Sequence, residues 1–429
     1  MNNPPSNNIA PEHRTLAQWL SYLESIHPTA IDMGLERVSD VARRIALNFE
    51  NATVITVGGT NGKGTTCRIL EQTLLAQGKS VGVYSSPHLM DYRERVRIND
   101  QLRPEQEYCD AFQQVEAARG EISLTYFEFG TLAAMLMLQA ARLDVIILEV
   151  GLGGRLDATN IVDADLAILT TIGLDHQDWL GDTREQIAQE KAGILRKGIP
   201  AVVGEPDPPS NLAAIIAGYG ALPSWAGKNF GYEQQGDTWS WFGSNARFSG
   251  LVMPKVPMQN VSTALAALEQ LECLPECDVL NAVLEHATLP GRRQQIQDHP
   301  TVIVDVAHNP QATEEMARWL DNCCFDNLYI VVGMLKDKAI AETLASLANY
   351  RAHWYLASTD GPRGCDASSL LSALPAGTVE SSHSFPKVVE AYRGALEKAQ
   401  QNDLILVFGS FLTVADVLAF HTDRSTCKE

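Results

Sequence analysis

The chain has 429 residues, of which 45% are hydrophobic, and it carries a formal net charge of −19 with an isoelectric point of about 4.9. This length predicts two or three domains with sizeable cores. A chain this acidic lacks the positive footprint that general binding to nucleic acid or to an anionic membrane requires, so the composition excludes both classes of partner.

The cysteines and the apolar stretches predict a cytoplasmic protein. The eight cysteines form no Cys-x-x-Cys pair and are expected to be reduced thiols. The first residues, MNNPPSNNIAPEHR, are polar and lack the apolar core of a signal peptide. The longest apolar region, residues 129–150, contains Gln139, Arg142 and Asp144, so we interpret it as a buried helix followed by a strand and not as a membrane span.

In chain order, short apolar runs first alternate with helical patterns. The runs predict strands at residues 53–58, 80–85, 144–150 and 165–172, and the stretches between them predict helices at residues 63–77, 104–119 and 128–142. Strands separated by helices favour a mostly parallel sheet with helices on both faces. The run VIILEV is apolar almost throughout, as in strands that are buried on both faces.

The pattern changes between residues 201 and 257. Prolines are dense in GEPDPPS, and YEQQGDTWSWFGSNARF alternates aromatic with polar residues, so this region is predicted to form short antiparallel strands. Helices are expected at residues 259–271 and 278–286. The stretch LPGRRQQIQDHP, residues 289–300, has the turn signals of a linker.

A second alternation follows, with strands predicted at residues 301–306, 328–332, 353–356 and 403–408. The predicted fold class is therefore α/β. An N-terminal domain has a mostly parallel sheet plus a small antiparallel sheet, and a smaller C-terminal domain is Rossmann-like. The predicted boundaries are residues 1–291 for the first domain, 292–300 for the linker and 301–429 for the second domain.

Unusual residues follow four of the predicted strands. A glycine loop at residues 58–64 follows the first strand, and SSPH at residues 85–88 follows the second. Glu149 lies near the end of the third strand, and LDH at residues 174–176 follows the fourth. Because ligands of open parallel sheets bind at the carboxyl ends of strands, these features predict one site with a phosphate loop, a hydroxyl, a carboxylate and an imidazole.

The glycine loop, GGTNGKG, departs from the common pattern G-x-x-x-x-G-K-[ST], because the first glycine falls on Val57 and the final Ser/Thr falls on Gly64. It still predicts an ATP site. Backbone N–H groups at such a strand–helix turn face an anion, and Lys63 adds a full positive charge. The alternative is a tight turn with a solvated lysine.

The other candidate residues each have a structural alternative. Glu149 would either contact Mg²⁺ or pair with an arginine such as Arg155. Ser86 alone is typical of a turn hydroxyl, and His176 alone is typical of a surface or capping histidine. On helix chemistry alone, Lys191 in REQIAQEKAGIL is expected to be exposed.

Two further motifs leave alternatives open. YRERVRI predicts a strand with Arg93, Arg95 and Arg97 on one face, which is either solvated or guides an anionic substrate. VIVDVAHNP places Asp305 and His308 where a strand ends. Asp305 would then either hold a ribose hydroxyl or be an incidental neighbour of an Asn-Pro turn.

An ordered set of segments carries a family resemblance: GGTNGKGTT, YSSPHL, RERVRI, LEVGLGGRLDATN, LDH…LG, EKAGI, LPGR, DVAHNP and GPRG. Through this set the chain resembles the folylpolyglutamate synthase family, which are relatives of the Mur ligases, and within it the bifunctional members that also make dihydrofolate. The resemblance extends from about residue 16 to residue 417. Members of this family have glycine after the loop lysine, so Gly64 is a family trait.

The resemblance implies the following site residues. ATP contacts fall on Thr60, Asn61, Gly62, Lys63, Gly64, Thr65, Asn260, Arg292 and Asp305. Metal contacts fall on Ser86, Glu149 and His176, and Lys191 is implied to be carbamylated to N6-carboxylysine. The pteroate part of the substrate is implied to contact Asp32, Met33, Gly34, Leu35, Thr125, Tyr126, Phe127, Glu128, Leu156, Asp157 and Ala158. Lys63, Lys191 and His308 form the implied catalytic set, with His308 as one candidate base, and Ser410 lies near the site by analogy.

The implied activity is an ATP-dependent amide ligase. It adds L-glutamate to 7,8-dihydropteroate, which gives dihydrofolate, and to reduced folates that already carry glutamate, in both cases through an acyl phosphate. Mg²⁺ at two sites is the implied cofactor, K⁺ is a further ion that the resemblance allows, and a monomer is the implied state.

Four other functions compete with this reading. A monofunctional folylpolyglutamate synthase is the nearest rival, and a Mur-type cell-wall ligase is disfavoured because only about fifty residues precede the loop. A P-loop ATPase switch would leave Glu149, His176 and Lys191 unexplained. A non-enzymatic scaffold would have no use for a phosphate loop.

Overall fold

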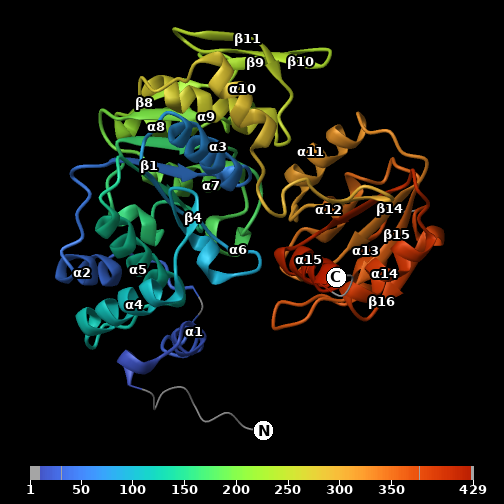
Figure 1. Ribbon diagram of the computed structural model, residues 1–429, viewed down its shortest axis with the longest axis horizontal. Helices are drawn as coiled ribbons and strands as arrows, with labels where there is room; N and C mark the ends of the chain where they lie inside the picture. Colours follow the sequence, from blue (N-terminus) through green and yellow to red (C-terminus); the bar gives the residue numbers. More distant parts are fainter. Residues whose placement is uncertain (1–9, 30, 376, 427–429) are drawn as a thin grey trace. The chain divides into compact units, whose positions relative to one another are not determined.

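The computed structural model describes residues 10–29, 31–375 and 377–426, and the chain separates into two compact units (Figure 1). The first unit comprises residues 1–172 and 184–287, and the second comprises residues 173–183 and 288–429. The short segment 173–183 therefore packs with the C-terminal part of the chain, although it interrupts the first unit in sequence. The domain limits at 291 and 301 remain predictions.

The main sheet of the first unit has eight strands within the described residues, in the order β4-β3-β2-β5-β1-β6-β7-β8. The six strands from β2 to β8 in this order run parallel, and β3 pairs antiparallel with β2 and β4. The strands are β1 (Thr53–Gly58), β2 (Val81–Tyr84), β3 (Val96–Ile98), β4 (Gln101–Leu102), β5 (Val145–Glu149), β6 (Leu166–Leu169), β7 (Pro200–Val203) and β8 (Leu222–Trp225).

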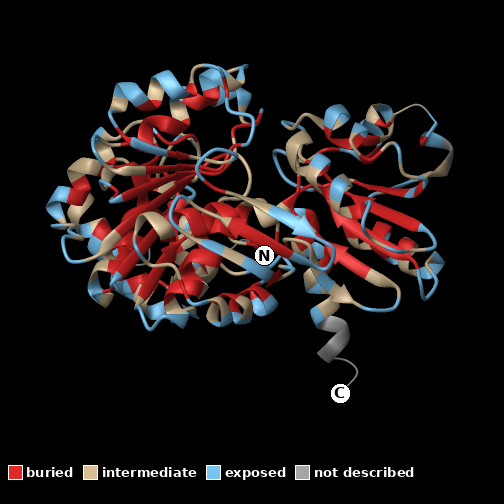
Figure 2. Cartoon of the chain, turned by 90° about the horizontal axis from the view of Figure 1, so that it is seen from above, coloured by how far each residue is buried: buried red, intermediate tan, exposed pale blue. Residues whose placement is uncertain are grey.

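Helices cover both faces of this sheet, as predicted. Alternate strand residues belong to two different cores, since Ile55 and Ile147 pack in one cluster while Val54 and Ile146 pack in the other. The first core includes α3 (Lys63–Ala76), α9 (Met258–Gln270) and α10 (Cys277–His286). The second includes α1 (Leu16–Leu23), α2 (Glu36–Arg44), α4 (Glu105–Arg119) and α5 (Tyr126–Ala141). The strands consequently appear as buried in Figure 2.

The small antiparallel sheet is also confirmed. Its strands β9 (Gly231–Gln235), β10 (Thr238–Phe242) and β11 (Arg247–Val252) lie in the order β11-β10-β9. Trp239 and Trp241 of β10 are fully buried in the core that contains α9, which explains why aromatic residues recur at every second position in this stretch.

One prediction for residues 201–257 is wrong. The first part of this region does not form short antiparallel strands; β7 and β8 extend the parallel sheet, with α8 (Leu212–Tyr219) between them. The prolines of GEPDPPS lie in the loop before α8 and obscure this strand–helix–strand unit in the sequence. Residues 200–203 form a parallel strand because they pair with β6, and a pattern within one sequence does not reveal such pairing.

The second unit has a six-stranded sheet within the described residues, in the order β12-β13-β17-β14-β15-β16. All neighbours are parallel except β12 and β13. The strands are β12 (Gln294–Gln297), β13 (Thr301–Val304), β14 (Leu328–Val332), β15 (Ala352–Ala357), β16 (Ser382–Phe385) and β17 (Leu404–Phe408). The helices are α6 (Gln177–Leu180), α11 (Pro310–Leu320), α12 (Ile340–Ala345), α13 (Ala367–Ala373), α14 (Val388–Lys398) and α15 (Phe411–Thr426). The sequence did not predict β12, which lies in the linker stretch, or the polar β16.

Together the two units confirm the predicted α/β fold class, with a parallel-dominated sheet and a small antiparallel sheet first and a smaller α/β unit second. Across the described part of the chain, no helix combines the length and apolar character that crossing a membrane requires.

Candidate active site

The carboxyl ends of three neighbouring strands bring several predicted site residues to one edge of the first unit's sheet. Glu149 of β5 lies opposite Val57 of β1, and Leu148 of β5 lies opposite Tyr84 of β2. The glycine loop begins directly after Val57, and Ser86 lies two residues beyond Tyr84. The loop, the Ser86 hydroxyl and the Glu149 carboxylate therefore share one edge, because parallel strands end side by side.

Glycine at position 62 is required by the shape of the loop. Gly62 precedes the first residue of α3 with φ at 87°, and no side chain caps the N-terminus of this helix. A Cβ at Gly62 would lie 2.4 Å from Oδ1 of Asn260. No capping side chain therefore occupies the start of α3, where the helix dipole favours an anion, and the predicted ATP residue Asn260 packs directly against the loop.

Two threonines that the sequence interpretation did not single out hold the loop in place. The backbone N–H of Thr60 donates to the carbonyl oxygen of Thr171 at 2.7 Å, and that of Asn61 donates to Thr171 Oγ1 at 2.9 Å. Thr170 Oγ1 donates to the carbonyl oxygen of Asn61 at 2.7 Å. Both threonines directly follow β6, the parallel neighbour of β1, so their position at a strand end was the available signal.

Two lysine amino groups meet at the loop. Lys63 Nζ donates to the carbonyl oxygen of Gly59 at 3.0 Å, and Lys191 Nζ donates to the same oxygen at 2.9 Å. Lys191 ends α7 (Arg184–Lys191) and is only 4% exposed, so the expectation from helix chemistry that it is exposed is wrong. A buried lysine beside a phosphate loop is placed to respond to an anionic ligand or to be modified.

Glu149 is 6% exposed and lies close to the first turns of α3. Burial, and then the charge of Glu149, raise the pKa of the fully buried Cys67 thiol of α3. Arg155, the alternative partner considered for Glu149, pairs with Glu190 at 2.8 Å. The carboxylate of Glu149 is therefore a low-exposure oxygen donor at the loop edge, which is a setting that suits a hard cation.

Arg37 joins two of the predicted pteroate segments. Its Nη1 lies 2.8 Å from Oδ2 of Asp32, and its Nη2 donates to Oε1 of Glu128 at 3.0 Å. The other oxygen of Glu128 accepts the backbone N–H of Thr125, which completes a capping box at the start of α5. One buried carboxylate thus caps α5 and, through Arg37, fixes the segment that contains Asp32. The position of Arg37 in the sequence DMGLERV does not indicate that it joins these two segments.

The third predicted pteroate segment lies against the second. A Cβ at Gly151 would lie 2.5 Å from Cζ of Phe127, so the ring packs directly on the backbone after β5. The Gly151 N–H donates to Asp157 Oδ2 at 3.0 Å, and Thr159 Oγ1 donates to Oδ1 at 2.6 Å. Burial raises the pKa of the Asp157 carboxyl, although these hydrogen bonds act in the opposite direction. The structure therefore brings all three segments together within the first unit.

The prediction that Arg93, Arg95 and Arg97 share one face of a strand is wrong. Residues Tyr92–Arg95 form a 3-10 helix, capped by Asp91, and only Arg97 lies in β3. The three guanidinium groups consequently point to different surroundings.

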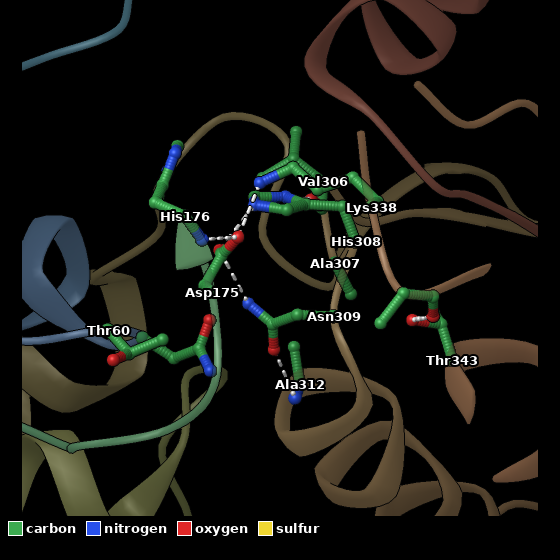
Figure 3. Close-up of polar contacts among 12 residues, drawn as sticks. Thr60, Asp175, His176, Val306, Ala307, His308, Asn309, Ala312, Lys338 and Thr343 are labelled. Atoms are coloured by element: carbon green, nitrogen blue, oxygen red, sulfur yellow. Dashed lines mark hydrogen bonds and ion pairs between the residues drawn. The ribbon is translucent and has the colours of Figure 1, made fainter. Parts of the chain in front are cut away.

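In the second unit, Asp175 gathers three donors (Figure 3). Lys338 Nζ lies 2.6 Å from Oδ1, while His308 Nε2 and Asn309 Nδ2 lie 3.3 and 3.2 Å from Oδ2. Burial raises the pKa of the Asp175 carboxyl. The His308 hydrogen bond and the charges of His308 and Lys338 nevertheless hold this pKa well below the usual range of an aspartate. Asp175 therefore ties the segment that contains His176 to the loops after β13 and β14.

His308 does not offer a lone pair to an amine in this arrangement. Its Nδ1 lies 2.8 Å from the carbonyl oxygen of Val306, and its Nε2 faces Asp175. Both ring nitrogens are thus directed at oxygen atoms. To act as a base, His308 would first have to leave Asp175.

The two remaining predicted ATP residues lie near each other in sequence on the second unit. Asp305 accepts the backbone N–H groups of Arg293 at 2.9 Å and Ala307 at 2.8 Å, which fixes the turn after β13. The guanidinium carbon of Arg292 lies 5.3 Å from the ring centroid of Phe411 at the start of α15. Both side chains are thus held by local contacts.

Within the described residues, no group of three or more His, Cys, Asp or Glu side chains is arranged to hold a metal ion. The donor set at the first unit's loop edge is instead one carboxylate, Glu149, and one hydroxyl, Ser86. This set fits Mg²⁺, which is usually bound by one or two carboxylates together with substrate phosphates and waters.

Comparisons with known proteins agree with these features. The sequence profiles of the Mur ligase middle domain and of the Mur ligase glutamate ligase domain match residues 57–268 and 291–411. The chain is 48% identical over 404 residues to the dihydrofolate synthase/folylpolyglutamate synthase of Escherichia coli K12, which covers 94% of each chain.

Two similar solved structures contain ligands. The structure of E. coli FolC in complex with DHPP and ADP is 47% identical with a TM-score of 0.93, and the match covers 97% of this chain and 100% of that one. A bifunctional folylpolyglutamate synthase/dihydrofolate synthase with Mn, AMPPNP and L-glutamate bound is 48% identical with a TM-score of 0.89, and the match covers 95% and 98%.

Proposed function

Because the chain belongs to the dihydrofolate synthase/folylpolyglutamate synthase family of Mur ligases, we propose that it is an ATP-dependent ligase that joins L-glutamate to 7,8-dihydropteroate and to reduced folates. The observation that carries this proposal is the start of α3, where no side chain caps the helix N-terminus and Lys63 lies at the glycine loop. This arrangement fits an anionic phosphate chain.

ATP phosphates would bind the loop from Thr60 to Thr65, with Asn260 against it and with Arg292 and Asp305 as contacts from the second unit. Lys63 would leave the carbonyl oxygens of Gly59 and Thr60 to contact the phosphates. The threonines after β6 keep the loop fixed while Lys63 moves, so the exchange costs little backbone reorganisation.

Ser86, Glu149 and His176 would hold Mg²⁺, at two sites, and K⁺ is a further ion that the family resemblance suggests. When bound, the divalent metal supplies charge neutralisation on the transferred phosphoryl group. Lys191 is the candidate for carbamylation. Its burial and its contact with Gly59 place its amino group where a carbamate would add an anionic oxygen ligand to the site.

The reaction needs activation of an unreactive carboxylate. A carboxylate oxygen of the acceptor attacks the γ-phosphorus of ATP, which releases ADP and gives an acyl phosphate. The amine of L-glutamate then attacks the acyl carbon, the C–O bond to phosphate breaks, and an amide and inorganic phosphate form while one proton leaves the nitrogen. His308 is the proposed acceptor of that proton, after it separates from Asp175.

The three segments that Arg37 and Phe127 hold together would form the wall for the pteridine and aminobenzoate rings. Aromatic and aliphatic side chains on these segments, Met33, Leu35, Tyr126, Phe127 and Leu156, provide an apolar surface, and the carboxylates Asp32 and Asp157 provide acceptors. We propose in addition that the protein is a cytoplasmic monomer. Sedimentation velocity tests the oligomeric state, and a dimer would contradict it.

The activity is tested by ADP release with Mg·ATP and L-glutamate in the presence of dihydropteroate, tetrahydrofolate or no acceptor. ADP release that requires glutamate and occurs with either acceptor supports the bifunctional ligase. ADP release with tetrahydrofolate alone would reduce the function to a monofunctional folylpolyglutamate synthase. ADP release without acceptor and glutamate would favour an ATPase switch.

A further inference from the structure

The sequence RERVR contains three arginines whose surroundings differ. Arg93 pairs with Asp91, with Nη2 2.6 Å from Oδ2, and about a third of its side chain is exposed, at 35%. Arg97 pairs with the fully buried Glu71 of α3, with Nη2 2.9 Å from Oε2. Each of these guanidinium groups is balanced by a carboxylate of the protein.

Arg95 is different. It is 8% exposed, and its Nε donates to Nδ1 of His88 at 2.9 Å. Its guanidinium carbon lies 5.1 Å from the ring centroid of Tyr92 and 5.7 Å from that of Tyr126. Because Nδ1 of His88 accepts this hydrogen bond, the imidazole is neutral in this arrangement. Among the described residues, no carboxylate forms an ion pair with Arg95.

A buried cation with only neutral partners is costly. Cation–π contacts offset only part of the desolvation penalty, and a neutral imidazole adds one hydrogen bond. A guanidinium presents its N–H groups as a planar fork that matches a carboxylate in two parallel hydrogen bonds. An anionic ligand would therefore complete the surroundings of Arg95 in a way that the protein itself does not.

The position of Arg95 indicates which ligand this is. Tyr126, under its guanidinium, begins α5 and belongs to one of the three proposed pteroate segments. The carbonyl oxygen of Arg95 accepts the backbone N–H of Ser85, the neighbour of the proposed metal contact Ser86. Arg95 thus lies between the proposed acceptor wall and the strand end where phosphoryl transfer would occur.

We propose that Arg95 binds a carboxylate of the pteridine acceptor. This inference rests on the proposed function and adds a binding residue to it. The shared chemistry is a planar carboxylate, which has two sources: the benzoate carboxylate that dihydropteroate brings to the reaction, and the non-reacting α-carboxylate of the glutamyl tail in tetrahydrofolate.

The first test is equilibrium binding without ATP, in which dihydropteroate is compared with its carboxamide. Wild-type protein is expected to bind the acid roughly 10- to 100-fold more tightly than the amide, because a charge-assisted hydrogen bond is lost with the carboxamide. Arg95→Met should bind both alike, and Arg95→Lys should keep part of the preference because it retains the charge but loses the fork. Arg93→Met is the matched control and should retain the wild-type preference.

Steady-state kinetics identify the source of the carboxylate. If Arg95→Lys raises KM for both acceptors, Arg95 binds the reacting carboxylate. If it raises KM for tetrahydrofolate alone, Arg95 binds the glutamyl α-carboxylate. In the second case, the binding comparison uses tetrahydrofolate and its α-amide. KM for ATP should stay unchanged in either case.

The inference and the proposed function fail in different ways. If Arg95→Met and Arg95→Lys retain the wild-type preference and KM values while wild-type ligase activity is present, the inference is overturned and the proposed function stands. If wild-type protein has no ligase activity with either acceptor, the proposed function fails. Should Arg95→Met not fold, as judged by circular dichroism and ATP binding, Arg95→Lys alone decides the question.

Discussion

The first and second units both start a helix directly after a parallel strand, but they close the helix N-terminus differently. In the first unit, α3 follows Gly62 and no side chain caps it. In the second unit, Oδ1 of Asn309 accepts the N–H of Ala312 at the start of α11, and Oγ of Ser410 accepts the N–H of Thr413 at the start of α15. The same strand–turn–helix arrangement thus suits an anion better at α3, which has no side-chain cap, than at α11 and α15, each of which has one.

The charged groups follow the same division. In the second unit, Asp175 is surrounded by donors of the protein, and the cluster is complete without a ligand. In the first unit, the amino groups of Lys63 and Lys191 converge on one carbonyl oxygen of the phosphate loop. The proposed phosphate contact Lys63 thus lies beside the lysine proposed to be carbamylated, whereas the charges of the Asp175 cluster balance one another.

The largest expected effect is on ligase turnover and concerns Lys63 at the start of α3. Lys63→Ala is expected to lower ligase turnover by about 10²–10³-fold, because a donor to developing phosphate charge is removed. The fold should be retained, since Lys63 donates to carbonyl oxygens of a loop that Thr170 and Thr171 also hold in place. Lys79→Ala, an exposed lysine just beyond the other end of α3, is the control and should leave ADP release at the wild-type rate. Normal turnover of Lys63→Ala would remove the basis for the phosphate site.

In the second unit, we expect the loss of a carboxylate at Asp175 to lower the free energy of unfolding. Asp175→Asn leaves Lys338, whose side chain is 5% exposed, without its carboxylate, so the free energy of unfolding should fall by about 3 kcal/mol. Urea unfolding followed by circular dichroism measures this loss. Asp337→Asn breaks the more exposed pair with Arg363 and should cost less than about 1 kcal/mol. Equal losses in the two variants would show that the Asp175 cluster is not special.

A substitution of Arg37 separates acceptor binding from ATP binding within the first unit. Glu128 both caps α5 and pairs with Arg37. Arg37→Ala should raise KM for dihydropteroate about tenfold and leave KM for ATP unchanged, because it releases the segment that contains Asp32 but does not touch the loop. Arg43→Ala on the same helix, which breaks an exposed pair with Asp40, is the matched control. A parallel rise in both KM values would point to general damage of the unit.

The smallest effect concerns the capped helix α15. Ser410→Ala should lower the free energy of unfolding by about 1 kcal/mol, whereas Ser410→Gly should cost only a few tenths of that amount, because glycine is tolerated as an N-cap. Thermal unfolding compares the two variants. No difference between them would mean that the Ser410 hydroxyl does not act as a cap.

The sequence predicted best those elements whose signal is local. Strand β1 was predicted at its observed limits because an apolar run ends in two glycines, and the boundary between α5 and β5 follows from the polar residues that interrupt a long apolar stretch. β7, β8 and β12 were missed because their pairing with distant strands determines them. The arginine face was wrong because a capping box at Asp91 turns the chain into a 3-10 helix, which a period of two does not reveal.

The candidate site shows the same limit. The loop, Ser86 and Glu149 could be placed at one edge because parallel strands end together. Arg37 and Lys338 could not be found, since their partners Asp32, Glu128 and Asp175 are identified only by contacts in space. The burial of Lys191 likewise depends on packing against the loop and not on its helix.

The most direct test of the account follows oxygen from the acceptor. Dihydropteroate with both carboxylate oxygens labelled with ¹⁸O is incubated with the protein, Mg·ATP and L-glutamate, and the products are analysed by mass spectrometry. If the carboxylate is activated as an acyl phosphate, one labelled oxygen appears in inorganic phosphate for each amide formed, and the other remains in the amide. Label in AMP, or unlabelled phosphate released together with ADP, would contradict phosphorylation of the acceptor.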